Sequence, residues 1–382
     1  MKIAVFTDTY HPEINGVTKT LDKMKSAMDR RGIEYIFFAP GEGPFKEEGK
    51  CVSFFASFRF FAYPQCRIAL PDYGVVKKRL DEFKPDIIHL TTPFTIGLSG
   101  LRYAKENGIA HTATYHTDFP EYLDHYGFGI IKNGAWQFLK WFHDSPDINF
   151  APSEQTRLKM ENEEIGRLGL WKRGIEKDRF NPGFRDNGLR EQWGCEDEVC
   201  LLHVGRLAKE KELDVLMGAV RILNDRNVKF KLVIVGDGPM RTQLEACGYK
   251  NIVFCGYMTG QDLSRCYASA DAFCFTSGTE TYGNVLLEAM ASGLPAVSVI
   301  EGGAGENVVD EKNSLVFKRG SARDMADKLE RMIEDETLRK RLSNGALEHV
   351  SGKSWKDVFD ELFSAYGQLI DNKRGEGKRS AS

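Results

Sequence analysis

The chain lacks the features that mark membrane-spanning or broadly nucleic-acid-binding proteins. Its 382 residues contain no run of eighteen apolar residues, so we expect no bilayer-crossing helix. The first residues read as a strand and carry no signal-peptide pattern. The formal net charge is −3, which argues against a generally basic, nucleic-acid-binding protein. We therefore expect a cytoplasmic protein, with contact at the inner face of a membrane left open.

Motifs for several cofactors and for disulfide frameworks are also missing. The eight cysteines form no Cys-x-x-Cys pair and no zinc-like spacing with histidine, which favours buried free thiols. No Gly-x-Gly-x-x-Gly motif is present, which argues against NAD or FAD. Neither a Walker motif nor a Gly-x-Ser-x-Gly elbow occurs. We therefore expect no cofactor.

Short β-branched segments alternate with helical patterns along the whole chain, which is typical of parallel β–α–β units. The expected strands of the first half are residues 3–6, 35–39, 87–90, 110–115 and 148–151. Those of the second half are residues 199–204, 230–235, 252–255, 272–275, 296–299 and 314–317. The pattern predicts an α/β protein with two Rossmann-like halves and a cleft between them.

The segment Phe180–Phe184 carries the Pro/Gly pattern of a linker. We accordingly expect a first domain over residues 1–180 and a second over residues 181–355. An amphipathic helix is expected over about residues 356–372. The basic, Gly- and Ser-containing residues 373–382 predict a flexible tail.

Two carboxylates, Glu280 and Glu288, lie eight residues apart in a segment that runs from an expected strand through a glycine turn into a helix. Each could accept paired hydrogen bonds from vicinal hydroxyls, such as those of a hexose and of a ribose. The residues between them include Tyr282, Gly283, Asn284 and Val285.

Cations and glycines follow two other expected strands of the second half. Arg206 comes directly after a strand, and Lys211 lies five residues later. Both side chains could bind a diphosphate. The alternative is that they are solvated surface charges. Gly236 and Gly238 form a tight turn after the next strand.

In the first half, Gly16 stands at a strand-to-helix turn, where backbone N–H groups can approach a phosphate. A plain helix start is the alternative. His116 ends an expected strand, and a purely structural histidine is the alternative there. Asp118 could orient this imidazole or approach an acceptor.

Four motifs follow one another along the chain in the order found in one protein family. They are the glycine of the first loop, Tyr-His-Thr, Gly-Arg-Leu-x-x-x-Lys and Glu-x7-Glu. Together they resemble family 4 retaining glycosyltransferases of the GT-B fold, the glycosyl transferases group 1, in the style of lipid-directed hexosyl- and mannosyltransferases. The resemblance covers the whole chain. It implies two Rossmann-like domains facing each other across a cleft, with a last helix crossing back to the first domain.

The resemblance also implies a nucleotide-sugar donor and a role for each motif. Arg206, Lys211 and the Gly16 backbone would stabilise the leaving diphosphate. Glu280 would hold the hexose and Glu288 the ribose.

Further donor-side roles follow from the same resemblance. His116 would position the transferred sugar. Gly236 and Gly238 would lie near the nucleotide base. No Asp-x-Asp motif is present, so the cations would replace a metal ion, and we expect none.

The acceptor side is indicated by the aromatic segment Phe54–Pro64, in which Phe58 and Arg59 form the centre. An apolar loop there would meet a lipid, glycolipid or saccharide acceptor, or a membrane surface. Core packing or an ordinary strand is the alternative.

The sequence thus predicts a retaining, metal-independent glycosyltransferase that moves a hexose from a nucleotide-sugar of the UDP-glucose or GDP-mannose type to a hydroxyl acceptor. Two alternatives stay open. One is a UDP-sugar epimerase of similar fold, and the other is a non-catalytic nucleotide-sugar-binding protein.

Overall fold

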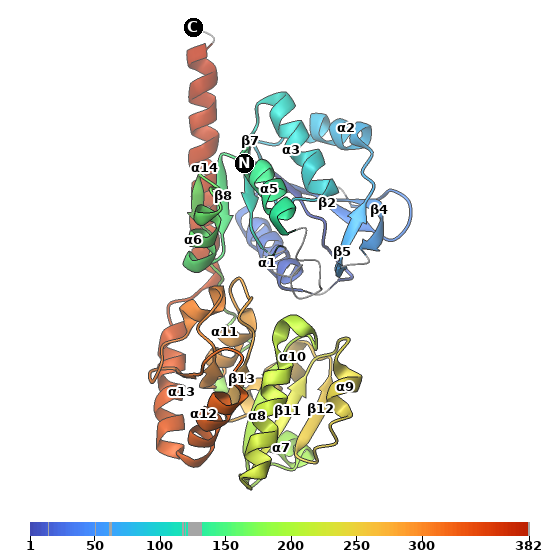
Figure 1. Ribbon diagram of the computed structural model, residues 1–382. Coiled ribbons are helices and arrows are strands. Elements are labelled where there is room, and N and C mark those ends of the chain that lie inside the picture. The colour runs from blue at the N-terminus through green and yellow to red at the C-terminus, as the bar shows by residue number, and fades with distance from the viewer. Residues whose placement is uncertain are drawn as a thin grey trace. The chain divides into compact units, whose positions relative to one another are not determined.

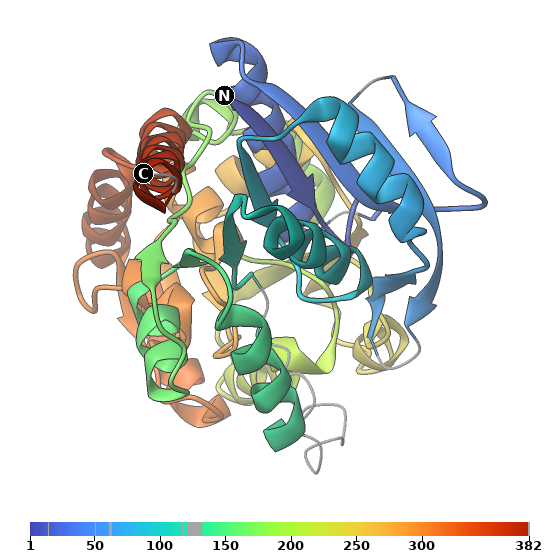
Figure 2. The same ribbon diagram turned by 90° about the horizontal axis from the view of Figure 1, so that it is seen from above.

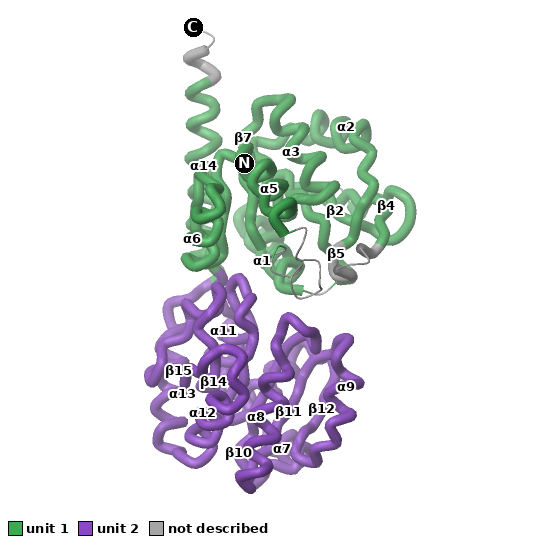
Figure 3. Tube along the Cα trace, in the orientation of Figure 1, with its two compact units in different colours: residues 1–172, 355–382 green, residues 173–354 purple. Residues whose placement is uncertain are grey.

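The structure is a computed structural model that describes residues 1–13, 15–49, 51–60, 63–116, 118, 120 and 132–380, with side chains for all of these except residues 59–60, 63–66 and 377–380. The chain folds into two compact units (Figure 3). Unit 1 comprises Met1–Lys172 and Trp355–Ser382, and unit 2 comprises Arg173–Ser354. The division therefore falls before residue 173 rather than after residue 180. The expected linker lies inside unit 2, where Asn181 caps the short 3-10 turn Pro182–Phe184.

Unit 1 is built on a nine-stranded sheet with the order β3-β4-β2-β1-β6-β7-β8-β9, and β5 pairs with β4. Its strands are β1 (Lys2–Phe6), β2 (Glu34–Gly41), β3 (Lys46–Glu48), β4 (Val52–Phe60), β5 (Tyr63–Ala69), β6 (Ile87–Leu90), β7 (Ala110–Thr114), β8 (Ile148–Ala151) and β9 (Leu168–Leu170). Among these described strands, β3 and β5 run antiparallel to their neighbour β4, and the other pairs are parallel. The central parallel strands are largely buried on both faces, which explains their mostly apolar sequences.

Helices cover both faces of this sheet (Figure 1). They are α1 (Gly16–Arg31), α2 (Tyr73–Phe83), α3 (Thr95–Asn107), α5 (Lys132–His143), α6 (Glu154–Asn162) and α14 (Trp355–Ser380). The apolar sides of α1 and α14 share one core cluster with the sheet, and those of α2 and α3 share another. In the part of the chain that the structure describes, no helix is long and apolar enough to cross a membrane.

The last helix, α14, returns the chain to unit 1, as the sequence predicted, and is seen end-on in Figure 2. Tyr366 is buried, and its hydroxyl lies 2.8 Å from Nδ1 of His89 in β6. The helix continues to Ser380, so the flexible tail expected from residue 373 is helical up to that point. At the start of this part, Lys373 forms an ion pair with Asp147 and Arg374 forms one with Asp86, both in unit 1. Composition alone could not reveal these acidic partners.

Unit 2 contains a six-stranded parallel sheet with the order β12-β11-β10-β13-β14-β15. Its strands are β10 (Val199–Val204), β11 (Phe230–Val235), β12 (Ile252–Gly256), β13 (Ala272–Phe275), β14 (Ala296–Ser298) and β15 (Ser314–Val316). Its helices are α7 (Asn187–Trp193), α8 (Leu213–Asp225), α9 (Arg241–Glu245), α10 (Gly260–Ser269), α11 (Asn284–Ala291), α12 (Ala322–Glu334) and α13 (Glu336–Val350). One apolar cluster joins α10 and α11 to the sheet, and another joins α8 and α12 to it.

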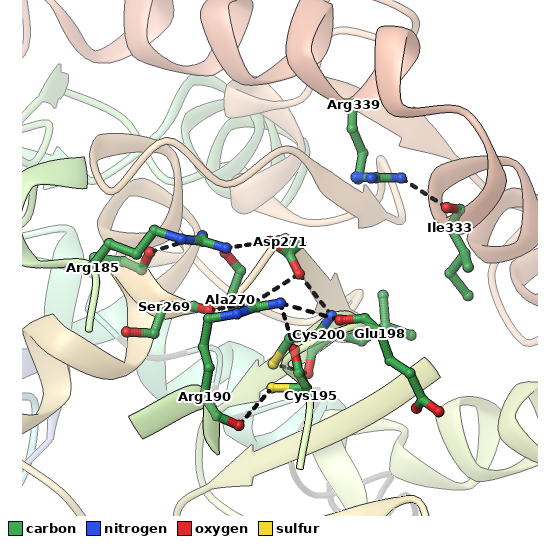
Figure 4. A network of polar contacts seen from close by, with 12 residues as sticks. Arg185, Arg190, Cys195, Glu198, Cys200, Ser269, Ala270, Asp271, Ile333 and Arg339 are labelled. Atoms are coloured by element: carbon green, nitrogen blue, oxygen red, sulfur yellow. Dashed lines mark hydrogen bonds and ion pairs between the residues drawn. The ribbon is translucent and has the colours of Figure 1, made fainter. Parts of the chain in front are cut away.

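A buried arginine fastens α7 to the sheet of unit 2 (Figure 4). The Arg190 guanidinium is 2.9 Å from the Asp271 carboxylate and donates to the carbonyl oxygens of Ser269, Cys195 and Glu198. These acceptors compensate the cost of burying the charge. Cys195 and Cys200, which flank this network, are buried free thiols.

The contact between α14 and the sheet predicts a large cost for one core substitution. Phe359 is fully buried and packs against Trp171, Trp355 and Phe363. We expect Phe359→Ala to lower the free energy of unfolding by about 3–5 kcal/mol, measured by urea unfolding with tryptophan fluorescence. Glu361→Ala, an exposed position of the same helix, should change it by less than about 0.5 kcal/mol. Equal effects of the two variants would contradict this packing.

Candidate functional site

Most of the predicted donor-side residues lie at one edge of the unit 2 sheet. They occupy the segments that follow β10, β11 and β13. These strands are parallel neighbours, so their carboxyl ends meet at the same edge. Open α/β sheets bind ligands at this edge. The structure therefore brings together residues 205–211, 236–239 and 277–283, which are far apart in the sequence.

The glycine turn after β11 packs directly on the turn that carries Arg206. Leu207 N donates to Asp237 O at 2.9 Å, and Gly205 N donates to Val235 O at 3.0 Å. Gly236 has a φ of 142°, and a Cβ there would lie 1.8 Å from the carbonyl oxygen of Gly205. A glycine is required at this position because two backbones meet. This close approach supplies a structural reason for Gly236, beside the base contact that the sequence predicted.

Hydroxyl groups lock the turn Lys209–Lys211 to the segment after β13. Thr276 Oγ1 donates to the Lys211 carbonyl at 2.5 Å, and Ser277 Oγ donates to the Glu210 carbonyl at 3.1 Å. Thr279 Oγ1 also donates to the Glu210 carbonyl, at 3.3 Å. We call these contacts the hydroxyl clamp. The clamp fixes the two loops that carry Lys211 and Glu280.

Charged side chains project from the clamped loops. The Lys211 ammonium forms an ion pair with the Glu280 carboxylate, and their side chains are 15% and 24% exposed. Arg206 lies 3.5 Å from the buried carboxylate of Glu210. Two cations and a carboxylate thus stand within reach of solvent at the ligand-binding edge. They can meet an anionic phosphate and a hydroxyl-bearing sugar.

The helix α11 begins at this edge, directly after Tyr282 and Gly283. Gly283 is its N-cap with a φ of 76°, and no side chain caps the helix. The Tyr282 hydroxyl donates to the Arg173 carbonyl at 3.2 Å, and burial raises the pKa of Tyr282. Asn284 and Val285, in the first turn, are half-buried. An uncapped helix N-terminus favours an anion through its N–H groups and its dipole.

Glu288 lies one turn further along α11 and is only 7% exposed. The hydroxyl of Tyr267 in α10 donates to its Oε2 at 2.9 Å. The two glutamates of the Glu-x7-Glu motif thus have different contacts, since Glu280 pairs with the Lys211 ammonium and Glu288 accepts from the Tyr267 hydroxyl. This difference suits two separate roles.

In unit 1, Gly16 is the first residue of α1, as the sequence predicted for a helix start. Asn15 Oδ1 accepts hydrogen bonds from the N–H groups of Val17 and Thr18, at 2.9 and 3.0 Å. The side chain of Asn15 therefore satisfies two of the donors that an anion would use. A phosphate contact through Gly16 stays a prediction.

His116 follows β7 in unit 1, and its ring meets Trp171 edge-on at 5.5 Å between centroids. Asp118 is buried, and its two oxygens contact the Tyr115 hydroxyl at 3.0 Å and the Lys159 ammonium at 2.6 Å. These contacts anchor the backbone beside His116 to α6. They give Asp118 a structural task that the sequence did not indicate.

The aromatic segment around Phe58 is a hairpin of β4 and β5 rather than a loop. Phe58 pairs with Ile68, and Leu70 N donates to Ala56 O, so these four side chains lie on one face. Phe58 and Leu70 are 53% and 66% exposed. The side chain of Arg59 lies outside the described residues.

Among the described residues, no three His, Cys, Asp or Glu side chains gather in a way that could hold a metal ion.

Both halves of the chain match known family models. Residues 187–349 match glycosyl transferases group 1, and residues 14–179 match glycosyltransferase family 4. Over 373 residues the chain is 30% identical to a GDP-mannose-dependent alpha-mannosyltransferase of Mycobacterium tuberculosis, covering 96% of both proteins. The chain belongs to the glycosyl transferases group 1.

Two further comparisons describe this glycosyltransferase. An alpha-monoglucosyldiacylglycerol synthase of Streptococcus pneumoniae is 28% identical over 313 residues, which are 78% of this chain and 71% of the relative. The solved structure of sucrose-phosphate synthase from Thermosynechococcus elongatus matches with a TM-score of 0.79 at 18% identity, covering 97% of this chain and 99% of that one. The predicted GT-B fold and glycosyltransferase class are confirmed. The epimerase alternative is set aside.

Sequence reasoning missed several residues that shape the glycosyltransferase site. The hydroxyl clamp donors Thr276, Ser277 and Thr279 stand next to the glutamate motif, so hydroxyl residues directly after a buried strand were the available signal. Tyr267 reads as an ordinary buried residue of α10. Only the structure places its hydroxyl on Glu288.

The close approach at Gly236 predicts a marked effect of one added methyl group. Gly236→Ala should displace the Gly205–Arg206 turn, lower the melting temperature and weaken binding of a nucleoside diphosphate about tenfold or more. Gly248 also has a positive φ, of 68°, but a Cβ there meets nothing within 4 Å. Gly248→Ala should cost only about 1 kcal/mol of stability and leave affinity unchanged. Calorimetry and differential scanning fluorimetry would measure both. Similar affinities of the two variants would contradict the turn packing.

Proposed function

We propose that this glycosyltransferase moves a mannosyl residue from GDP-mannose to a hydroxyl of a lipid or glycolipid, with retention of the α configuration and without a metal ion. The mycobacterial relative, named as GDP-mannose-dependent, supports this donor. The streptococcal relative, named for a glucosyl lipid, supports a lipid-type acceptor and keeps glucose from UDP-glucose as the second donor. The observation that carries the proposal is the Lys211–Glu280 pair beside Arg206 at the ligand-binding edge.

The leaving group would be stabilised by fixed charges. Breaking the bond between the sugar C1 and the diphosphate oxygen leaves negative charge on the diphosphate. Arg206 would bind it through a guanidinium fork and Lys211 as a point charge. The uncapped N-terminus of α11 would add N–H groups and a favourable dipole. These groups take the role that a divalent cation has in other transferases.

The sugar and ribose would be held by carboxylates. Glu280 would accept hydrogen bonds from hexose hydroxyls, and Glu288 from the ribose diol. Gly236 and Gly238 would lie near the base. In unit 1, Gly16 would approach the diphosphate, and His116 would position the sugar.

Retention requires the acceptor oxygen to bond to C1 on the face that the diphosphate leaves. The acceptor hydroxyl loses its proton as the new C1–O bond forms. The departing diphosphate oxygen can take this proton, so atoms and charges balance without a covalent enzyme intermediate. No residue is assigned as a nucleophile.

A direct assay tests the donor, the metal independence and the leaving-group role together. We expect transfer from GDP-mannose to dispersed diacylglycerol or a hexosyl-diacylglycerol to persist in EDTA and to give an α-linked product by NMR. Arg206→Ala should lower turnover about 10²-fold because a charge-stabilising donor is lost. Arg221→Ala, an exposed arginine of α8, is the matched control and should keep normal turnover.

Each contrary result contradicts a separate part of the proposed function. Product from UDP-glucose alone would overturn the donor assignment. Loss of activity in EDTA that Mg²⁺ restores would overturn metal independence. A β-linked product would overturn retention. A near-normal rate of Arg206→Ala would remove this residue from the site.

The exposed face of the β4–β5 hairpin supports contact with a membrane surface. Phe58, Ile68 and Leu70 are large apolar residues that share this face. Phe58 and Leu70 are the most exposed of the three. Apolar side chains at a protein surface can enter the headgroup region and place a lipid acceptor near the enzyme. We therefore propose that unit 1 contacts the bilayer through this hairpin.

Vesicle binding tests this contact. The double variant Phe58→Ser/Leu70→Ser should bind vesicles of phosphatidylcholine and phosphatidylglycerol about tenfold less tightly in a flotation assay, because apolar burial is lost. Serine adds no charge that could repel the lipid. Val309→Ser in unit 2, where the side chain is 43% exposed, should bind as the parent protein does. Unchanged binding of the double variant would exclude this hairpin as the contact.

A further inference from the structure

Tyr267 and Glu288 form a buried hydroxyl–carboxylate contact between two neighbouring helices of unit 2. Tyr267 lies in α10 and Glu288 in α11, and the phenol oxygen is 2.9 Å from Oε2. The tyrosine is fully buried, and the glutamate nearly so. A buried carboxylate needs hydrogen-bond donors, and this hydroxyl supplies one.

Packing fixes the direction in which the hydroxyl points. The Tyr267 ring meets Phe180 edge-on at 5.6 Å and lies 5.9 Å from the ring of Phe273. Both neighbours are themselves buried. Burial, and then the nearby Glu288 carboxylate, raise the pKa of Tyr267 far above its ordinary value. The phenol therefore keeps its proton and acts as a donor to the carboxylate.

A glutamate side chain has three rotatable bonds, so its carboxylate plane is not set by the helix alone. Binding a vicinal diol needs both oxygens at defined positions, and a ligand must otherwise supply the ordering free energy. A rigid donor on one oxygen removes much of this cost. A contact of this kind therefore raises the affinity for the diol.

We propose that Tyr267 is a positioning residue that orients the Glu288 carboxylate for the ribose diol of the donor nucleotide. The inference rests on the proposed function, in which Glu288 holds the ribose. It adds a residue outside the Glu-x7-Glu motif to the recognition of the nucleotide. Tyr267 itself touches Glu288 rather than the substrate.

A competing explanation is that the contact only ties α10 to α11. A second phenol–carboxylate contact, in which the carboxylate is half exposed, serves as a comparison. In unit 1, the buried Tyr103 donates to Asp81 Oδ1 at 2.8 Å, again from a phenol to a carboxylate. Tyr103→Phe therefore removes a phenol–carboxylate hydrogen bond in unit 1, whereas Tyr267 and Glu288 lie in unit 2.

The experiment compares GDP with 2′,3′-dideoxy-GDP by calorimetry in the parent protein, Tyr267→Phe, Tyr103→Phe and Glu288→Gln. We expect the parent to bind GDP about tenfold or more tightly than the dideoxy analogue, since a charged hydrogen-bond acceptor is engaged. Tyr267→Phe and Glu288→Gln should reduce this preference to about threefold or less, with affinity for the analogue unchanged. Tyr103→Phe should keep the full preference.

Steady-state kinetics give a second readout. A purely structural role of Tyr267 would not change KM for the donor selectively. Tyr267→Phe should raise KM for GDP-mannose about tenfold and change kcat less than threefold, because the ribose is held alike in the ground and transition states. The preference for GDP over the dideoxy analogue is a ratio of two affinities of the same variant, so partial unfolding of that variant does not alter it.

The outcomes separate this inference from the proposed function. A full ribose preference in Tyr267→Phe would overturn the positioning role and leave the proposed function standing. Equal binding of GDP and its dideoxy analogue by the parent would overturn the ribose role of Glu288 and the inference with it. No binding of GDP or UDP by the parent would contradict the proposed function itself.

Discussion

The site of unit 2 depends on the hydroxyl clamp between the turn after β10 and the segment after β13. A 3-10 turn of three residues has few hydrogen bonds of its own, so its position is set from outside. Thr276, Ser277 and Thr279 supply those bonds through the carbonyls of Glu210 and Lys211. The loop is also held by the turn after β11, where Gly236 and Gly238 leave no room for a Cβ atom. Arg206 and Lys211 are thus carried by a backbone that is fixed before any ligand arrives, as electrostatic catalysis requires.

In unit 1 a comparable constraint comes from the returning helix. Trp171 lies between His116, His89 and Phe359, in edge-on contacts with all three. Phe359 belongs to α14, and Trp171 is followed by the point where the chain leaves unit 1. Trp171, whose ring contacts His116, is therefore part of the aromatic cluster at the point where the chain leaves unit 1. Helix α14, which brings the chain back to unit 1, contributes Phe359 to the same cluster. Stability of unit 1 and orientation of His116 depend on the same aromatic residues.

The sequence predicted the buried parallel strands well and the polar details poorly. Residues 199–204 and 230–235 are strands in the structure because segments of that length that are apolar apart from His203 and Lys231 have few other stable solutions in an α/β protein. For the β4–β5 hairpin the sequence does not distinguish a loop from a strand, since the aromatic residues of β4 occupy both faces and hide the alternation. Residues 373–380 continue α14 in the structure, and Lys373 and Arg374 pair with acidic residues that are distant in sequence. Likewise, the task of Asp118 depends on Lys159, which periodicity cannot place beside it.

On the proposed function, the Lys211–Glu280 pair links recognition of the two ends of the donor. A sugar alone would meet a carboxylate that is already bound to an ammonium. A diphosphate offers the ammonium charge-assisted hydrogen bonds of its own, so it can compete with the carboxylate for this cation. Glu280 then gains acceptor capacity at the moment when the diphosphate is in place. On this proposal, the hexose would be held firmly only when it arrives attached to its leaving group, and the intact donor would be preferred over either of its parts.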